Sequence, residues 1–177
     1  MKYFTPEHYV RGNSTNPDDL RGIEEAWERA LRAYRRHWNR IRQAMPKAVQ
    51  QFVAGNVCLH DANVLSMTRT GKKLVLVLER EQPPQDLVIL TFTLAGDLEI
   101  DTAALPVRGE SNVVAWLYEE WDLDRRGQRW FEVLLSNGCS VKLPFRDFRY
   151  SIGEQLLPTS NGHRERSRAA STAGSVK

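Results

Sequence analysis

The sequence is poor in cysteine and has no long hydrophobic run, and both absences exclude whole classes of protein. Its 177 residues include only two cysteines, Cys58 and Cys139, which do not share a CxxC spacing. A disulfide-built fold or a zinc site is therefore not expected, and we interpret both thiols as buried in a cytoplasmic protein. No apolar run approaches the ~20 residues that span a bilayer, and the first residues lack a secretory signal.

An excess of one charge is also missing, except at the C-terminal end. The chain has 25 basic and 22 acidic residues, a formal net charge of +3. Residues 160–177 hold four basic residues and one acidic residue, so they carry 4 − 1 = +3 and residues 1–159 carry 21 − 21 = 0. The same end has almost no large apolar side chain. We therefore expect a single folded domain at 1–159 and a disordered basic tail at 160–177. The neutral body and the lack of aromatic residues in the tail argue against a nucleic-acid partner.

A stripe of apolar residues predicts one long amphipathic helix near the N-terminus. The stripe recurs at spacings of three or four: Leu20, Ile23, Trp27, Leu31, Tyr34, Trp38, Ile41 and Met45. Asn16 and Pro17 are typical of a helix start, and Pro46 would end the helix. We expect the helix to pack on a sheet and to bury four side chains of the stripe: Trp27, Leu31, Tyr34 and Trp38.

The opposite face of the same helix carries a row of arginines: Arg29, Arg32, Arg36 and Arg40. Two of them can pair with glutamates one turn earlier, and the acidic residues precede the basic ones, as the helix dipole favours. We interpret the row as a solvated helix face, and contact with nucleic acid is the alternative.

Short apolar segments joined by turns follow a second, short helix at about 47–54. Strands are expected near 63–68, 74–78, 87–94, 98–100, 113–123, 130–135 and 139–143, with a last edge strand near 148–152. Pro144 and Arg146 are expected to interrupt the pairing between the last two. Leu74 to Leu78 is apolar on both faces, so this strand should be central. Asn137–Gly138 predicts a hairpin with a type I′ turn.

These strands follow one another without helices between them, which predicts the fold class. We expect an α+β protein, with the long N-terminal amphipathic helix packed on a mainly antiparallel β-sheet of about six or seven strands. The segment from Val114 to Trp121 also fits a helix, so its assignment as a strand stays open at this level.

Three short sequence segments are distinctive beyond their secondary structure. They are Met1–Thr5 with Tyr9, Leu59–Ala62, and Trp116–Glu120 followed by Phe131–Leu135. Together they resemble a bacterial family known only as a domain of unknown function, number four thousand and eighty-five of that series. The resemblance covers most of residues 1–150 and implies a bacterial origin and a fold, but no mechanism. The step from His60 to Ala62 also resembles immunity proteins that neutralise bacterial toxins.

Few residues could carry chemistry. None of the four histidines has the spacing of a metal site on a helix, and no P-loop, nucleophile elbow or dinucleotide fingerprint is present, so no metal or cofactor is expected. His60 and Asp61 are the one pair that could act together as an acid and a base. The common alternative is that such a pair hydrogen-bonds the backbone at a sheet edge.

One segment combines aromatic anchors with carboxylates: Trp116, Tyr118, Glu119, Glu120 and Asp122. If these residues face solvent, they could hold a basic protein partner. Ordinary alternation, with aromatics inside and acids outside, is the alternative. We therefore expect a non-catalytic protein-interaction module, of which an immunity-like toxin neutraliser is one form. The second hypothesis is a small hydrolase or ligand-binding protein centred on His60 and Asp61.

Overall fold

The computed structural model describes residues 1–16, 20, 22–80, 86–102 and 113–154. Its helices are α1 (Pro6–Gly12), α3 (Ile23–Ile41), the 3-10 helix η1 (Arg42–Ala44) and α4 (Lys47–Ala54). Its strands are β1 (Asn63–Thr70), β2 (Lys73–Arg80), β3 (Asp86–Leu94), β4 (Glu99–Asp101), β5 (Trp116–Leu123), β6 (Arg129–Leu135) and β7 (Ser140–Glu154). The predicted α+β class is confirmed. Among the described residues, no helix has the length and apolar character needed to cross a membrane.

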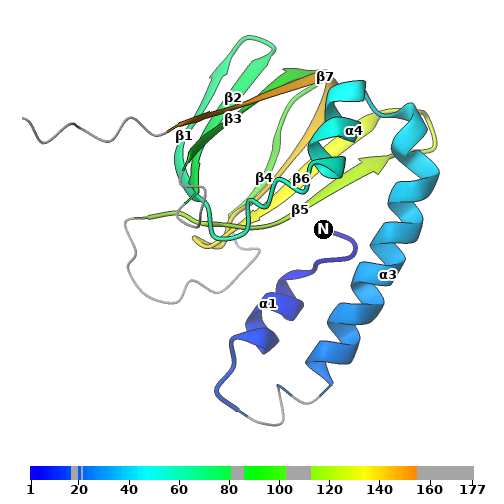
Figure 1. Ribbon diagram of the computed structural model, residues 1–177, viewed down its shortest axis with the longest axis vertical. Helices are drawn as coiled ribbons and strands as arrows, with labels where there is room; N and C mark the ends of the chain where they lie inside the picture. The colour runs from blue at the N-terminus through cyan, green and yellow to red at the C-terminus, as the bar shows by residue number, and fades with distance from the viewer. Residues whose placement is uncertain (17–19, 21, 81–85, 103–112, 155–177) are drawn as a thin grey trace, which may run out of the picture.

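The strands form one antiparallel sheet with the order β1-β2-β3-β7-β6-β5, and β4 pairs with β7. It consists of two three-strand meanders joined through β3 and β7 (Figure 1). β2 lies between β1 and β3, as its apolar residues on both faces predicted. The segment that could have been a helix is the strand β5.

The sheet curls until its two outermost strands meet at one end. Asn63 forms an isolated bridge with Ala115. The amide of Trp116 donates to the carbonyl of Ala62, and the amide of Val64 donates to the carbonyl of Val114, both at 2.8 Å. The start of β1 is therefore tied to the chain that leads into β5, and one concave face encloses the core.

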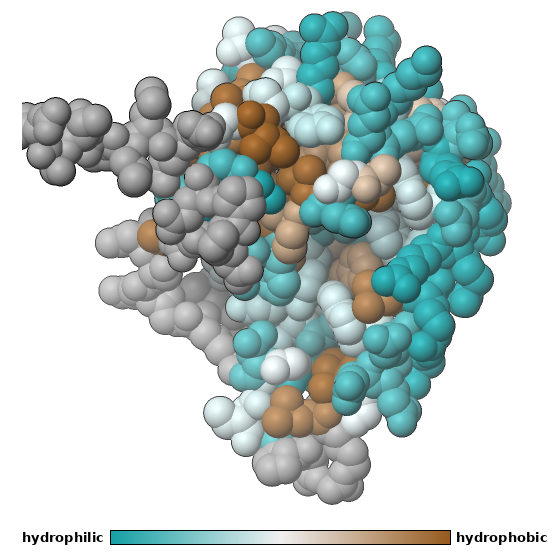
Figure 2. Space-filling view, viewed as in Figure 1, coloured by the Kyte–Doolittle hydropathy of each residue, from teal (hydrophilic) through white to brown (hydrophobic). Residues whose placement is uncertain are grey.

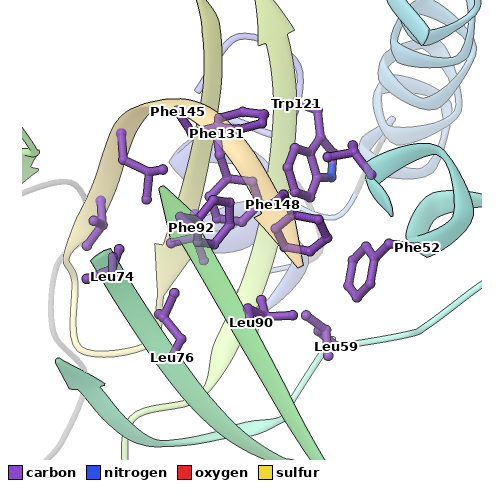
Figure 3. Packing of buried hydrophobic residues seen from close by; sticks show 14 of the residues in the cluster. Phe52, Leu59, Leu74, Leu76, Leu90, Phe92, Trp121, Phe131, Phe145 and Phe148 are labelled. Atoms are coloured by element: carbon purple, nitrogen blue, oxygen red, sulfur yellow. The ribbon is translucent and has the colours of Figure 1, made fainter. Parts of the chain in front are cut away.

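Aromatic side chains fill the centre of this core. Five of them are almost completely buried and come from β3, β5, β6 and β7 (Figure 3): Phe92, Trp121, Phe131, Phe145 and Phe148. The ring centroids of Trp121 and Phe131 lie 4.5 Å apart, which is the spacing of favourable aromatic pairs. α4 lies over the open side of the core, where Phe52 contacts Trp121 and Phe148 edge-on.

The long helix is shorter than predicted, but it packs against the sheet, as expected. α3 begins at Ile23, after Gly22 in a left-handed conformation, and the predicted start at Pro17 lies outside the described residues. Pro46 separates it from α4, as predicted. Its fully buried residues are His37 and Ile41, and the four stripe residues that were expected to be largely buried are covered only in part: Trp27, Leu31, Tyr34 and Trp38.

The N-terminal segment explains this partial burial, because it lies between α3 and the sheet. The ring of Phe4 lies 5.1 Å from Trp27, 5.2 Å from Tyr34 and 6.0 Å from Tyr118. α1 packs beside the first half of α3 (Figure 1), and the ring of its Tyr9 lies 6.3 Å from that of Tyr118 in β5. The apolar stripe thus faces aromatic rings of residues 1–12 as well as β5.

Three further predictions need correction. Pro144 does not interrupt the last strand: β7 runs from Ser140 to Glu154 and pairs with β6 in its first part and with β3 in its second. The change of partner coincides with a register shift next to Pro144, a position where proline is tolerated. The segment expected as an edge is therefore in the middle of the sheet.

The two cysteines are also less covered than expected, since Cys58 is exposed and Cys139 is only half-buried.

The hairpin at Asn137–Gly138 forms, but its predicted turn type is wrong. Only Gly138 has positive φ (85°), whereas a type I′ turn needs two such residues. The amide of Gly138 donates to the carbonyl of Leu135, and the amide of Leu135 donates to the carbonyl of Cys139. This is the longer hairpin loop in which glycine takes the left-handed position.

Candidate functional site

Strand β5 carries the residues expected to form an interaction surface, but two of them are inside the protein. Trp116 is completely buried and Glu120 is 5% exposed, while Tyr118, Glu119 and Asp122 are half-buried. A register shift between Trp116 and Tyr118 breaks the expected alternation. As a result, Glu119 pairs with core residue Val133 across the hairpin, and the expected solvent-facing row of acids does not form.

Glu120 faces the other side of the hairpin, where the N-terminal segment surrounds its carboxylate. The backbone amides of Lys2, Tyr3 and Phe4 donate to Glu120 at 2.8, 2.7 and 2.7 Å. Hydrogen bonds from backbone amides to a carboxylate are among the stronger ones in proteins. Glu120 is thus a structural anchor for residues 2–4, and charge reversal there is expected to affect folding.

Glu132 lies directly opposite Glu120 in the β5–β6 register. Two like charges in this position repel each other. The structure compensates the second charge as well, because the amino group of Met1 contacts Glu132 at 2.5 Å and the hydroxyl of Ser140 donates to it at 3.1 Å. The sequence holds no signal for this arrangement, since only the strand register brings the two glutamates together.

Asp122 and His37 form a contact between β5 and α3. The His37 Nε2 atom lies 2.7 Å from Asp122 Oδ1, although the approach does not have the geometry of a hydrogen bond. One residue earlier in the strand, the amide of Trp121 donates to the hydroxyl of Tyr34 at 2.9 Å. Burial raises the pKa of Tyr34, so its hydroxyl keeps its proton. These contacts fix the second half of α3 against β5.

His60 and Asp61 lie close to the start of β5. His60 Nδ1 is 3.3 Å from Asp61 Oδ1, and the two side chains are 49% and 65% exposed. The backbone of Asp61 has positive φ (65°), and its amide donates to the carbonyl of Trp116 at 2.8 Å. The ring of His60 lies 5.5 Å from that of Tyr118. The pair predicted from the sequence therefore meets part of the predicted β5 group in space.

Both side chains of this pair are largely exposed to solvent. Two hollows of the described surface lie elsewhere: one along α3 is lined by Glu24, Glu25, Glu28, Arg29 and Arg32, and the other lies beside Met1, Glu132 and Lys142. Within the same residues, no group of three or more histidine, cysteine or acidic side chains could hold a metal ion.

Glu119 is the acidic group nearest to this pair whose environment alters its titration. Burial raises the pKa of its carboxyl, while a 2.7 Å hydrogen bond from Trp116 Nε1 and the nearby His60 act in the opposite direction. Burial is the largest of these effects. Glu119 therefore holds its proton to a higher pH than an exposed glutamate does.

We expect this burial to make the protein less stable as the pH rises above 4.5, the ordinary pKa of the carboxyl. Above that pH the unfolded chain binds fewer protons at Glu119 than the folded protein, so the free energy of unfolding falls. Glu119→Gln keeps an acceptor for Trp116 and should remove this part of the pH dependence. Urea unfolding between about pH 4 and 8 measures it. Parallel profiles for the wild type and Glu119→Gln would contradict the expectation, and Glu99→Gln at an exposed position is the control.

Basic side chains gather where the end of α3 meets the turn between β5 and β6. Arg129 connects the two parts, because its Nε donates to the carbonyl of Ala44 at 2.8 Å and its Nη1 to the carbonyl of Arg146 at 3.4 Å. Six exposed arginines belong to the segments that meet at this junction and are called the arginine surface below: Arg36, Arg40, Arg42, Arg125, Arg126 and Arg146. Figure 2 shows the hydrophilic outer side of α3 that leads to it.

Five of these six guanidinium groups make no ion pair among the described residues, and Arg126 has Asp124 beside it. The arginines in the first half of the helix differ, since Arg29 and Arg32 pair with Glu25 and Glu28. The arginine row read from the sequence as a solvated face is therefore partly neutralised at its start and uncompensated at its end. Sequence reasoning missed the contribution of the turn, because only the fold brings Arg125 and Arg126 to α3.

Comparisons with known proteins identify no relative of this chain. A scan against family models, a search of the curated proteins and a search of the solved structures each found no match to this chain. The resemblance to a family of unknown function and to immunity proteins stays a prediction.

Proposed function

We propose that this protein binds another protein and carries out no reaction of its own. The observation that supports the proposal is the arginine surface: five of its six exposed arginines make no ion pair in the described part of the chain, and the sixth, Arg126, has Asp124 beside it. The body of the chain has equal numbers of acidic and basic residues. An uncompensated cluster on a neutral body is a local feature, and local charge of this kind directs association with a complementary surface.

The partner that we propose is acidic, whereas the sequence alone suggests a basic one. A basic partner was expected on the premise that the β5 carboxylates face solvent. Glu120 instead binds backbone amides, Glu119 binds Trp116, and Asp122 contacts His37. These three carboxylates therefore have partners within the protein, whereas the guanidinium groups of the arginine surface are exposed to a binding partner. A bacterial, cytoplasmic toxin neutraliser is the form of this function that the sequence resemblance suggests.

The proposal is tested by capture followed by reconstitution. The immobilised chain should retain a protein from a lysate of the source organism, and the purified partner should rebind in calorimetry with one defined stoichiometry. Immobilised Arg40→Glu/Arg126→Glu protein should lose most of that partner. A matched control, Lys72→Glu/Lys73→Glu, changes the net charge equally in the β1–β2 turn, which lies far from α3 (Figure 1). If no protein is retained and rebinds, the proposal is wrong.

A second candidate function is a small hydrolase or ligand-binding activity centred on His60. The observation in its favour is the convergence of His60 and Asp61 with Tyr118, together with the altered titration of Glu119 beside His60. An acid and a base in one place are what such chemistry needs. Against it stands the exposure of His60 and Asp61, since catalytic groups usually line a concave site.

An activity screen separates the two candidates. His60→Ala and Asp61→Asn replace exposed side chains, and asparagine tolerates the positive φ of residue 61, so both variants should fold like the wild type. Turnover of a small substrate that disappears in both variants would favour the second candidate over the first. Unchanged partner binding in both variants, with no turnover in any of the three proteins, is the result that we expect.

A further inference from the structure

We infer that the arginine surface binds a carboxylate-rich segment of the partner protein, with acidic side chains spaced one helical turn apart. The inference rests on the proposed function and adds the chemistry of the partner. It depends on how the surface is held, on which cations form it and on what surrounds it.

The backbone beneath the surface is fixed before any partner arrives. Arg129 bridges Ala44 at the end of η1 and Arg146 of β7 through its guanidinium group. In the turn, the carboxylate of Asp124 accepts hydrogen bonds from the amides of Arg126 and Gln128 at 2.8 and 2.9 Å. The exposed guanidinium groups therefore project from a rigid base, which reduces the ordering cost of binding.

The composition and spacing of the surface favour carboxylates. All six cations are arginines, whose planar fork can hold a carboxylate through two parallel hydrogen bonds. Protein interfaces are enriched in arginine and depleted in lysine. Arg36 and Arg40 stand one turn apart on α3, and side chains at this spacing are about 5–6 Å apart. Acidic residues at the same spacing on a partner helix would meet both of them.

The surroundings argue for a protein segment over a nucleic acid. A nucleic acid extends well past the junction, and outside the six arginines residues 1–159 hold 15 basic and 21 acidic residues, an environment that repels phosphates. The aromatic residue beside the turn, Trp130, is half-buried and has Lys142 Nζ 4.6 Å over its ring, so this face of the ring is covered and is not a platform on which bases can stack. A short acidic segment can instead lie entirely within the positive region.

The test uses a synthetic peptide of about 20 residues, long enough to form a helix, with glutamates at every fourth position and an alanine-rich remainder. Calorimetry at low salt should show binding to the full chain, weakening as salt is added. Arg40→Glu/Arg126→Glu should weaken it at least about tenfold. Lys72→Glu/Lys73→Glu should stay within about twofold, and a glutamine version of the peptide should not bind.

The opposite outcomes are equally specific. Absence of peptide binding, or equal loss in both double variants, overturns the inference. Tighter binding of a single-stranded or duplex oligonucleotide of similar charge would assign the surface to nucleic acid. A captured protein partner whose binding survives Arg40→Glu/Arg126→Glu would leave the proposed function standing and remove the inference, whereas the absence of any captured partner removes the proposed function itself.

Discussion

Replacing Trp121 with alanine should lower the free energy of unfolding by about 3–5 kcal/mol, the range seen when a large buried aromatic side chain is removed. Trp121 is 2% exposed and contacts rings from four elements: Phe52, Phe92, Phe131, Phe145 and Phe148. Such a site collapses poorly after truncation, because its neighbours are held in different strands. The loss is a large fraction of the stability of an ordinary domain.

Trp38 provides the comparison. It is half-buried on α3, so Trp38→Ala should cost about 1–2 kcal/mol, less than Trp121→Ala although the same atoms are removed. Urea unfolding followed by circular dichroism measures both, and similar slopes against urea would show that the two variants unfold from equally compact states. Equal losses for the two tryptophans would contradict the placement of α3 at the margin of the core.

Glu120→Ala should be the most damaging change at a charged residue that we consider, with an expected loss of about 3 kcal/mol. It removes the common acceptor of the amides of Lys2, Tyr3 and Phe4. Each amide left without an acceptor costs about 1–3 kcal/mol when it stays buried, so we expect residues 2–4 to detach instead of remaining unsatisfied. Detachment then exposes Phe4, which is 7% exposed in the intact protein.

Two measurements identify this mechanism. Hydrogen exchange of the amides of residues 2–4 should become fast in Glu120→Ala while the amides of the core strands stay protected. Glu120→Gln keeps one carbonyl oxygen as an acceptor and should cost less, about 1–2 kcal/mol. Asp97→Asn removes a carboxylate that is 91% exposed and should cost almost nothing. A loss in Glu120→Ala no larger than in Asp97→Asn would show that the N-terminal segment does not depend on this anchor.

Local patterns predicted the strands well where one face of the chain is buried. Val88, Leu90, Phe92 and Leu94 alternate in the sequence, and all four are almost completely buried on β3. The pattern works there because the side-chain period of a strand is two and the core lies on one side. The same reasoning fails for β5, because the register shift after Trp116 and the cover on both faces of the strand leave Glu119 half-buried and Glu120 almost completely buried.

Features that depend on distant pairing were beyond sequence reasoning. Nothing in the local sequence shows that β7 passes Pro144 and joins the two meanders, because the partner strand β3 lies about 60 residues earlier. The same holds for the arginine surface and for the anchoring of residues 2–4 by Glu120. His60 and Asp61 were recognised as a pair because they are neighbours in the chain, while their approach to Tyr118 needed the fold.

The contact between the start of β1 and the chain leading into β5 has a consequence for how the protein reaches its native state. It joins segments roughly 50 residues apart, whereas each meander is built from neighbouring strands. Loop-closure entropy delays such distant pairing, so we expect the meanders to form first and this contact to form late. Until then both outermost strands present unpaired amides and carbonyls, which are templates for pairing with other chains. The refolding chain is therefore most prone to aggregation before the start of β1 pairs with the chain that leads into β5.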